Sequence, residues 1–193
     1  MKKRVPEFKV AEFIINRWSP RAMSGESISN DELMSLFEAS KWAPSSYNNQ
    51  PWRFIYAKRE TPEWNAFLDL LVPFNQSWAK NGSVLIIIVS RNVFEYNGKP
   101  SRTHSFDAGA AWENLALQGS MNGLVVHGME GFDYEKAAKL ISLPDDYVVE
   151  AMCAVGKPGK LKNLPKELQD KEVISGRKFV RDIAFEGKFS SLK

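Results

Sequence analysis

The spacing of apolar residues along the chain changes between a helical and an alternating or continuous pattern, and these changes predict the elements. Leu33 and Leu36 fall at helical spacing within the first regular apolar pattern. Ser29 precedes this pattern and Glu32 follows three residues later, which is the arrangement of a capping box. The pattern therefore predicts a helix that begins after Ser29 and runs to about Lys41.

Four stretches have the apolar composition of strands. WRFIYAK at 52–58 is one, and the block around VLIIIV at 83–90 predicts a strongly buried strand. LVVHGMEGF at 124–132 and the segment 148–155 have strand character as well. The segment 92–102 contains Asn-Gly and Pro and is expected to be a loop.

Further helices are predicted between these strands. Pro62 opens one, and Asp107 is expected to cap a long helix that ends near Gly123. Asp133 is expected to cap another helix that runs through Leu143. Since the long helix is rich in Ala and Gly, other backbones can approach it closely, which predicts a central helix packed on several sides.

The order of elements predicts an α+β fold of one domain. A length of 193 residues suits a single domain, and 44% hydrophobic residues suffice for a core. After Gly156 the composition shifts to Lys, Pro and Gly, so residues from about 157 to 193 are expected to form an extended arm. The remainder is expected to place helices on a modest sheet.

The composition of the chain argues against several classes of function. The net charge of +3 is too small to indicate nucleic-acid binding, and no apolar run approaches the roughly 18 residues of a membrane span. The N-terminus lacks the apolar stretch of a signal peptide, so a soluble, cytoplasmic protein is expected. Cys153 is the one cysteine and is expected in the core, and two histidines make no metal cluster.

Four polar segments are candidates for chemistry, although each also suits a plain loop, turn or solvated tail. Arg17, Ser19 and Arg21 alternate in RWSPR, and their forked donors suit an anion such as a phosphate. APSSYNNQPWRF at 43–54 places short polar side chains between a helix and a strand. GMEGFD at 128–133 allows close backbone approach to a ligand, and GRKFVRDI at 176–183 forms a late basic group.

In this order the segments resemble the nitroreductase family of flavoproteins. The pattern R-x-S-x-R, the capped helix and the A-P-S-S-x-N-x-Q-P-W-x-F block match its N-terminal half, and that block is the most specific part. The match covers nearly the whole chain; it continues through FNQSW at 74–78, FDAGAAWENLALQGSMNGL at 106–124, EGFD at 130–133 and the late Arg-Lys pair. The sequence departs from the family at Phe179-Val180, where Pro-Leu is common.

The resemblance implies a nitroreductase-like α/β sandwich with a mixed central sheet flanked by helices. It also implies a homodimer whose C-terminal arm embraces the partner subunit, with FMN bound across the interface. Arg17 and Ser19 would hold the FMN phosphate together with Arg177, and Lys178 is a further candidate for that role.

The resemblance also places residues along the flavin ring. Arg21 matches a basic position near N1 and O2, where a cation stabilises reduced flavin. Asn75 matches a hydrogen bond to the pyrimidine edge, and the backbone of Glu130 and Gly131 would face N5. The partner subunit would contribute Pro44, Ser45, Ser46 and Asn48 from its copy of the polar loop. The remaining implied cofactor-binding residues are Trp18 and Gln50.

The implied function is transfer of hydride from NADH or NADPH through FMN to a small electron-poor acceptor, such as a nitroaromatic or quinone, with ping-pong kinetics. No side chain is assigned as catalytic, because the flavin carries the chemistry. Phe94, Tyr96 and His104 are expected to shape an open acceptor pocket. His104 is also a candidate proton donor, although water or the flavin can supply protons and a surface histidine is the commoner case. Two alternatives remain: a specialised flavin enzyme, such as a reductive dehalogenase or desaturase, and a non-enzymatic flavin-binding redox sensor.

Overall fold

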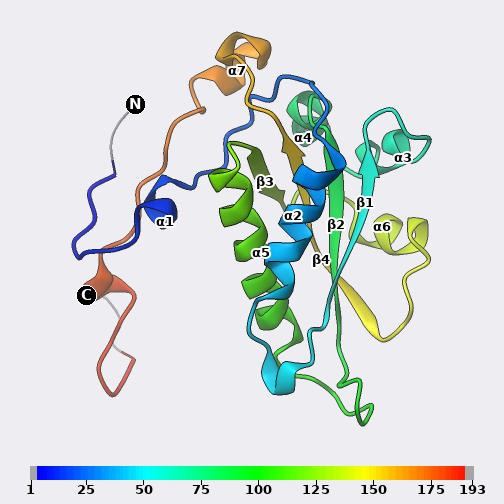
Figure 1. The fold of residues 1–193 in the computed structure, drawn as a ribbon, viewed down its shortest axis with the longest axis vertical. Helices are drawn as coiled ribbons and strands as arrows, with labels where there is room; N and C mark the ends of the chain where they lie inside the picture. Colours follow the sequence, from blue (N-terminus) through cyan, green and yellow to red (C-terminus); the bar gives the residue numbers. More distant parts are fainter. Residues whose placement is uncertain (1–3, 190–193) are drawn as a thin grey trace.

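A four-stranded sheet with strand order β1-β2-β4-β3 forms the centre of the molecule (Figure 1). The computed structural model describes residues 4–189. Its strands are β1 (Trp52–Lys58), β2 (Val84–Arg91), β3 (Val125–Met129) and β4 (Tyr147–Gly156). The α+β class is confirmed, but all three strand pairings among these residues are antiparallel, where a mixed sheet was expected. Long helical connections join the strands, so no hairpin turn in the sequence reveals their direction.

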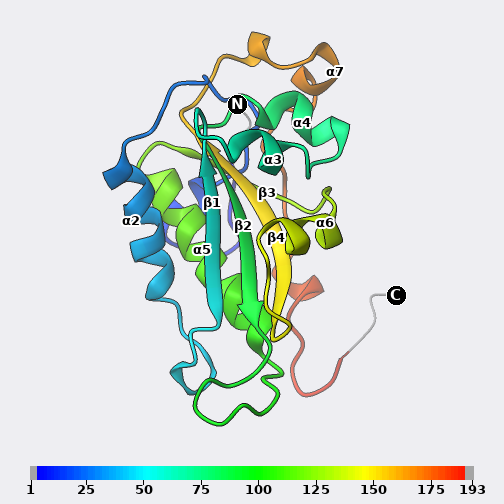
Figure 2. The same cartoon turned by 90° about the vertical axis from the view of Figure 1, so that its right-hand side faces the viewer.

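Helices cover both faces of the sheet (Figure 2). One face carries α2 (Asn30–Lys41) and α5 (His104–Met121). The other carries α3 (Trp64–Leu68), α4 (Pro73–Ala79) and α6 (Tyr134–Leu140). Alternate residues of β2 serve the two layers: Ile86 packs with α2 and α5, whereas Ile87 packs on the opposite side. The strand is therefore apolar at every position through Val89, as its continuous pattern predicted.

Local signals in the sequence correspond closely to several element boundaries. The Ser29 hydroxyl accepts a hydrogen bond from the Glu32 backbone at 3.1 Å, and the Glu32 carboxylate accepts one from the Ser29 backbone at 2.7 Å. This capping box starts α2 as predicted. Asp133 caps α6 by accepting from the Lys136 backbone at 2.9 Å, although α6 ends at Leu140 rather than Leu143.

The predicted start of the long helix is wrong. Helix α5 begins at His104 with Thr103 as its N-cap, so Asp107 lies within the first turn. The Asp107 side chain is buried and accepts a hydrogen bond from the Ser46 backbone at 3.0 Å. Its carboxylate is thus used to hold the 43–54 loop, a contact between distant residues that spacing alone does not reveal.

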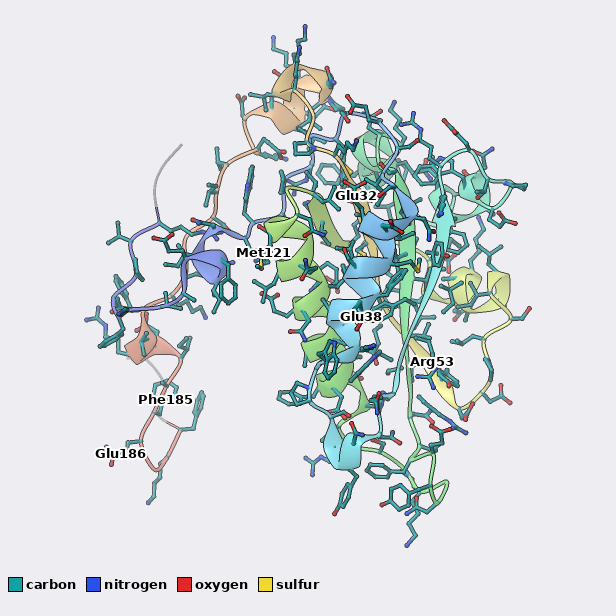
Figure 3. All side chains as sticks on the ribbon, in the orientation of Figure 1. Glu32, Glu38, Arg53, Met121, Phe185 and Glu186 are labelled. Atoms are coloured by element: carbon teal, nitrogen blue, oxygen red, sulfur yellow. The ribbon has the colours of Figure 1, made fainter. Side chains whose placement is uncertain are left out.

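The residues after β4 form the irregular arm expected from composition, with one short helix, α7 (Lys166–Gln169). The arm runs beside the N-terminal segment that carries α1 (Glu12–Asn16) (Figure 1). Arg4 donates to the Ser175 carbonyl at 3.0 Å, which ties the two segments together. Phe185 and Glu186 lie further along the arm, away from the sheet (Figure 3).

Strand β4 combines a buried thiol with an irregular register. Cys153 is fully buried and pairs with a residue of β2 on one side and of β3 on the other, so its predicted core position is confirmed. The register between β2 and β4 shifts near Glu150, because Ile88 pairs with Ala151 while Val89 pairs with Val149. Within residues 4–189, no helix combines the length and apolarity that crossing a membrane requires.

Candidate functional site

A cavity of about 610 Å³ lies between one face of α5 and the sheet. Helix α5 contributes Ser105, Ala108, Gly109, Trp112 and Glu113 to its wall. The sheet and the segments beside it contribute Ile88, Gly128, Met129, Glu130, Tyr134, Glu150, Ala151 and Met152, and Arg17 and Ser19 complete the lining. Three of the predicted site residues, Arg17, Ser19 and Glu130, therefore meet at one cavity.

Two glycines form part of the wall of this cavity. A Cβ atom built on Gly128 would lie 2.9 Å from the Trp112 ring, closer than a carbon contact allows. The Trp112 ring can therefore lie against the β3 backbone only because residue 128 has no side chain. A Cβ atom on Gly109 would meet nothing within 4 Å, which shows that the helix face there is open.

Positive charge gathers beside the cavity. Arg17 donates to the Ser19 hydroxyl at 3.3 Å and pairs with Glu113 at 3.4 Å. Arg4 donates to the Arg17 carbonyl at 2.8 Å, and both Arg4 and Arg177 bond the Ser175 hydroxyl, at 3.4 Å and 3.0 Å. Partial burial and then repulsion from Arg177 and Arg17 lower the pKa of Arg4. These three residues, Arg4, Arg17 and Arg177, form an arginine cluster suited to an anion.

The arginine cluster also borders a second groove of about 890 Å³ between the N-terminal segment and the C-terminal arm. Arg17 and Glu113 line both this groove and the cavity, so the two spaces adjoin. Arg177 and Lys178 line the groove from the arm, as two predicted basic residues. The predicted phosphate-binding residues are therefore gathered around one corner of α5.

Arg21 has a partner that spacing did not predict. Its guanidinium lies 3.8 Å from Glu172, whose other carboxylate oxygen accepts from the Arg21 and Ala22 backbones at 2.6 Å and 2.8 Å. Arg21 Nε and Glu172 Oε2 are buried without a hydrogen-bond partner. Arg21 does not line the cavity, so its placement beside a ligand ring stays a prediction. Trp18, the other predicted residue of this segment, is partly buried and also lies outside the lining.

Asn75 and Gly131, two of the predicted site residues, contact each other, while their placement beside a flavin ring stays a prediction. The Asn75 side-chain amide donates to the Gly131 carbonyl at 3.0 Å, and the Val72 backbone donates to the same oxygen at 3.1 Å. A Cβ atom at residue 131 would lie 2.8 Å from the Asn75 amide nitrogen, so a larger residue there would displace the Asn75 side chain. The Glu130 side chain is exposed at the cavity.

The 43–54 loop lies at the N-terminal end of α5 (Figure 1), and none of its residues belongs to the lining of the cavity. Tyr47, Asn48 and Gln50 have φ angles of 51°, 54° and 46°, a left-handed conformation that is unusual for residues other than glycine. The Ser45 hydroxyl stabilises the turn by accepting from the Gln50 backbone at 3.0 Å. Within one chain, the loop does not bring Pro44, Ser45, Ser46, Asn48 or Gln50 to the cavity where Arg17 lies.

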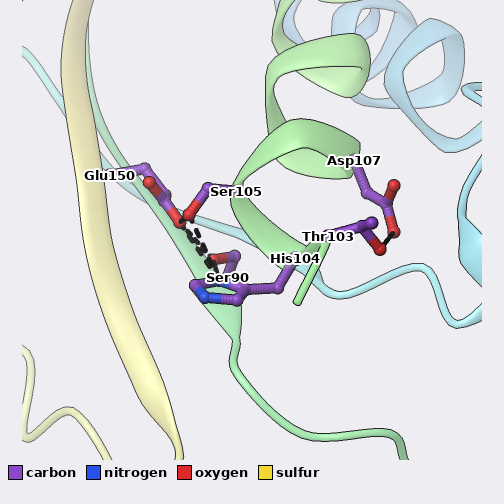
Figure 4. A network of polar contacts seen from close by, with 6 residues as sticks. All are labelled: Ser90, Thr103, His104, Ser105, Asp107 and Glu150. Atoms are coloured by element: carbon purple, nitrogen blue, oxygen red, sulfur yellow. Dashed lines mark hydrogen bonds and ion pairs between the residues drawn. The ribbon is translucent and has the colours of Figure 1, made fainter. Parts of the chain in front are cut away.

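A polar network at the start of α5 was not predicted from the sequence (Figure 4). Glu150 Oε1 accepts hydrogen bonds from Ser90 and from Ser105, the latter at 2.8 Å. His104 Nδ1 lies 2.7 Å from Ser90 Oγ and 3.4 Å from Glu150 Oε1. Glu150 and Ser105 line the cavity, so this network forms part of its wall.

Comparison with known proteins identifies the family. The model of the family described as the nitroreductase family matches residues 14–71 and 57–157. The chain belongs to the nitroreductase family. The resemblance seen in the sequence is thereby confirmed, and the nitroreductase match covers the segments that carry Arg17, the 43–54 loop, Asn75 and Glu130.

Individual members of the nitroreductase family extend the comparison. A solved structure described as an oxidoreductase containing FMN is 42% identical, covers 98% of this chain and 97% of its own, and has a TM-score of 0.93. The protein DrgA of Synechocystis is 30% identical over 161 residues, covering 67% of this chain and 77% of the relative. An Archaeoglobus fulgidus relative, 24% identical over 76% of this chain and 84% of its own, is provisionally named an NADH dehydrogenase/NAD(P)H nitroreductase.

Two groups of site residues were not predicted from the sequence. Nothing in the sequence spacing of Arg4 links it to Arg17. Ser90 and Glu150 carried a usable signal, because each is a polar residue within an otherwise apolar strand pattern. Among residues 4–189, no three His, Cys, Asp or Glu side chains are grouped so as to hold a metal ion.

Proposed function

We propose that this protein is an FMN-dependent oxidoreductase that uses NADH or NADPH to reduce small electron-poor acceptors, such as quinones or nitroaromatics. Membership of the nitroreductase family supports the class of reaction. The 42% identical oxidoreductase that contains FMN supports the choice of cofactor. The observation that carries the proposal is the arginine cluster, which adjoins a cavity walled by the glycine-containing strand β3.

The arginine cluster fits the terminal phosphate of FMN. Arg17 and Ser19 would donate to it from the cavity side, while Arg177 and Arg4 would approach from the arm and the N-terminus. Lys178 adds a further cation on the same groove. Burial, and then repulsion from Arg177 and Arg17, lower the pKa of Arg4, and a dianionic ligand would relieve the repulsion. The donor set therefore suits FMN better than a cofactor without a terminal phosphate.

The opposite side of the cavity fits the flavin ring. When bound, FMN supplies the redox chemistry by taking hydride from the nicotinamide and giving it to the acceptor. The backbone at Glu130 and Gly131 would lie along the ring, and Asn75 holds that backbone in place. Arg21 would add positive charge near the ring from outside the cavity lining, where its Nε is a buried donor without a partner. Trp18 would pack beside this segment.

We infer further that the active form is a homodimer. Pro44, Ser45, Ser46, Asn48 and Gln50 do not reach the cavity of their own chain, and a partner subunit would bring its copy of this loop to it. The left-handed residues of the loop are consistent with such a role, since strained backbone often marks ligand contacts. The N-terminal segment and the arm expose Val5 at 87%, Phe8 at 69% and Ile183 at 65%, an apolar surface that a partner would cover.

The proposal is tested by the flavin content of purified protein. We expect flavin absorbance bands and release of FMN, not FAD, on denaturation. Bound flavin should then be bleached by NADH or NADPH under anaerobic conditions and restored by a quinone. Recovery of FAD, or absence of flavin after incubation with excess FMN, would falsify the cofactor assignment. Failure of both nicotinamides to bleach bound FMN would instead favour a redox sensor or a specialised flavin enzyme.

A further inference from the structure

The β-bulge in β4 directs a carboxyl group into the cavity. Ile88 pairs with Ala151 and Val89 with Val149, so Glu150 is the additional residue between them and has no strand partner. A bulge of this kind turns one side chain out of the alternating pattern, and bulges are common next to active sites. The Glu150 side chain lines the cavity and remains 23% exposed. The proposed binding of FMN makes no use of it.

The hydrogen bonds that join His104, Ser90 and Glu150 have a direction. Ser90 Oγ contacts both His104 Nδ1 and Glu150 Oε1, but a hydroxyl has only one proton to donate. Ser90 donates its proton to Glu150 Oε1, and the bond to His104 then requires a proton on Nδ1. The chain of donors therefore runs from His104 through Ser90 to Glu150. Ser105 donates to the same carboxylate oxygen and fixes its position.

The geometry does not suit a hydrolytic triad. In a triad, the acid and the serine lie at opposite nitrogens of the imidazole ring. Here Ser90, Ser105 and Glu150 all approach Nδ1, at 2.7 Å, 3.3 Å and 3.4 Å. Neither serine is therefore placed as a nucleophile activated by His104. The arrangement instead passes a proton in one direction.

We propose that His104, Ser90 and Glu150 form a proton relay that supplies the acceptor bound in the cavity. This inference rests on the proposed function. A quinone that receives a hydride on one oxygen has gained two electrons and needs one proton on its other oxygen to become a neutral hydroquinone. The protonated Glu150 carboxyl group gives that proton, and the carboxylate left behind regains one from the Ser90 hydroxyl as Ser90 takes the Nδ1 proton of His104. His104 is 20% exposed, and its Nε2 takes a proton from water as Nδ1 gives one up, so the ring stays neutral. Exchange with water then returns the ring proton to Nδ1 before the next turnover.

The relay predicts which acceptors depend on it. Acceptors that must be protonated as they are reduced, such as quinones, need the Glu150 proton. Ferricyanide takes electrons one at a time and binds no proton, so its reduction does not. The ratio of the two reoxidation rates in one protein therefore isolates proton delivery, because a general loss of folding or of flavin affects both rates.

The test uses FMN-loaded, pre-reduced protein in anaerobic stopped-flow experiments with a benzoquinone and with ferricyanide. In Glu150→Gln, we expect the quinone-to-ferricyanide rate ratio to fall about 100-fold, the scale of general acid catalysis. Ser90→Ala should lower the same ratio, because it removes the middle of the relay. Glu63→Gln is the matched control, since Glu63 is exposed at the N-cap of α3, far along the chain from the network. An unchanged ratio in both Glu150→Gln and Ser90→Ala would overturn the relay.

A second measurement does not depend on turnover. The chain has two histidines, so the ¹⁵N NMR signals of His104 are assigned by comparison with a His127→Gln variant. We expect the neutral ring of His104 to carry its proton on Nδ1, and Ser90→Ala to weaken that preference. A proton on Nε2 in the wild-type protein would reverse the direction of the chain and refute the relay. If the wild-type protein neither binds FMN nor is reduced by a nicotinamide, the proposed function fails and the relay fails with it. An intact function with an unchanged ratio rejects the relay alone.

Discussion

Two glycines of α5 should respond in opposite ways to the same substitution, Gly→Ala. Gly119 is buried against β3, and a Cβ atom built there would overlap the Val126 side-chain methyl Cγ2, well inside a carbon contact distance of about 3.5–4.0 Å. Gly109 lies in the same helix, yet its added Cβ atom would meet nothing within 4 Å. The pair therefore separates the steric effect of a methyl group from its effect on helix propensity.

The magnitudes depend on these surroundings. Replacing an interior helical glycine by alanine stabilises a helix by about 1 kcal/mol, and Gly109→Ala should gain that amount. In Gly119→Ala the gain is opposed by overpacking, which costs about 1–3 kcal/mol. Val126 is β-branched and has few alternative rotamers, so we expect the upper end of that range and a net loss of about 2 kcal/mol. At about 2–4 °C per kcal/mol for a chain of this size, the two melting temperatures should differ by roughly 6–12 °C.

The assay is urea unfolding of both variants and the wild-type protein, followed by circular dichroism. Flavin-free protein is used because Gly109 lines the cavity, and a change in FMN affinity would otherwise alter the apparent stability. Equal slopes of free energy against urea concentration are the control for a two-state comparison. If Gly119→Ala proves as stable as Gly109→Ala, then α5 does not pack closely on β3 at this position.

Three further predictions concern ligand binding, pH and assembly. Arg17→Ala should weaken FMN binding about ten- to hundredfold, because one charge-assisted hydrogen bond is worth about 1.5–3 kcal/mol. Arg21→Ala should instead lower the flavin reduction potential and leave the phosphate contacts intact. FMN titration and redox titration distinguish the two effects, and an unchanged potential in Arg21→Ala contradicts the placement of Arg21 at the ring. Burial lowers the pKa of His127, so the unfolded chain binds a proton that the folded chain does not as pH falls below about 6.5. The stability that comes from neutral, buried His127 should thus be fully present above that pH and should decrease as the pH falls toward the lower pKa of the folded state. In unfolding curves recorded at several pH values, His127→Gln should make this decrease less steep. An equally steep decrease in the variant would show that other groups cause it. Analytical ultracentrifugation at micromolar concentration should give a dimer, and a stable FMN-loaded monomer would contradict the shared site.

The elements that sequence patterns predicted best are those set by neighbouring residues. The Ser29 capping box and the strand at 52–58 depend on contacts or alternation within a few positions, and both are present. Asp107 failed as a helix cap because its carboxylate binds the Ser46 backbone, 61 positions away. Spacing carries no information about a partner at that separation.

The same distinction explains the candidate site. Arg17, Ser19 and Glu130 belong to short segments with recognisable composition, and the fold brings them to one cavity. Arg4 joins them only because the N-terminal segment and the arm run side by side. Glu150 reaches the cavity only because the pairing of β2 with β4 shifts by one residue. Strand register and the pairing of distant segments arise from the assembled fold. The polar character of Glu150 within an apolar strand could mark it as unusual, but its neighbours in the sequence could not place it, or Arg4, at the cavity.

The burial of Cys153 gives the molecule an internal probe of its own motions. It is the only cysteine in the chain, it pairs with strands on both sides, and burial raises the pKa of its thiol. A thiol-labelling reagent can react with it only after the middle of the sheet has opened, because the reactive species is the exposed thiolate. The labelling rate therefore measures how often the central strands separate under native conditions. Opening of the central strands can thus be followed in the wild-type protein, without mutating a residue.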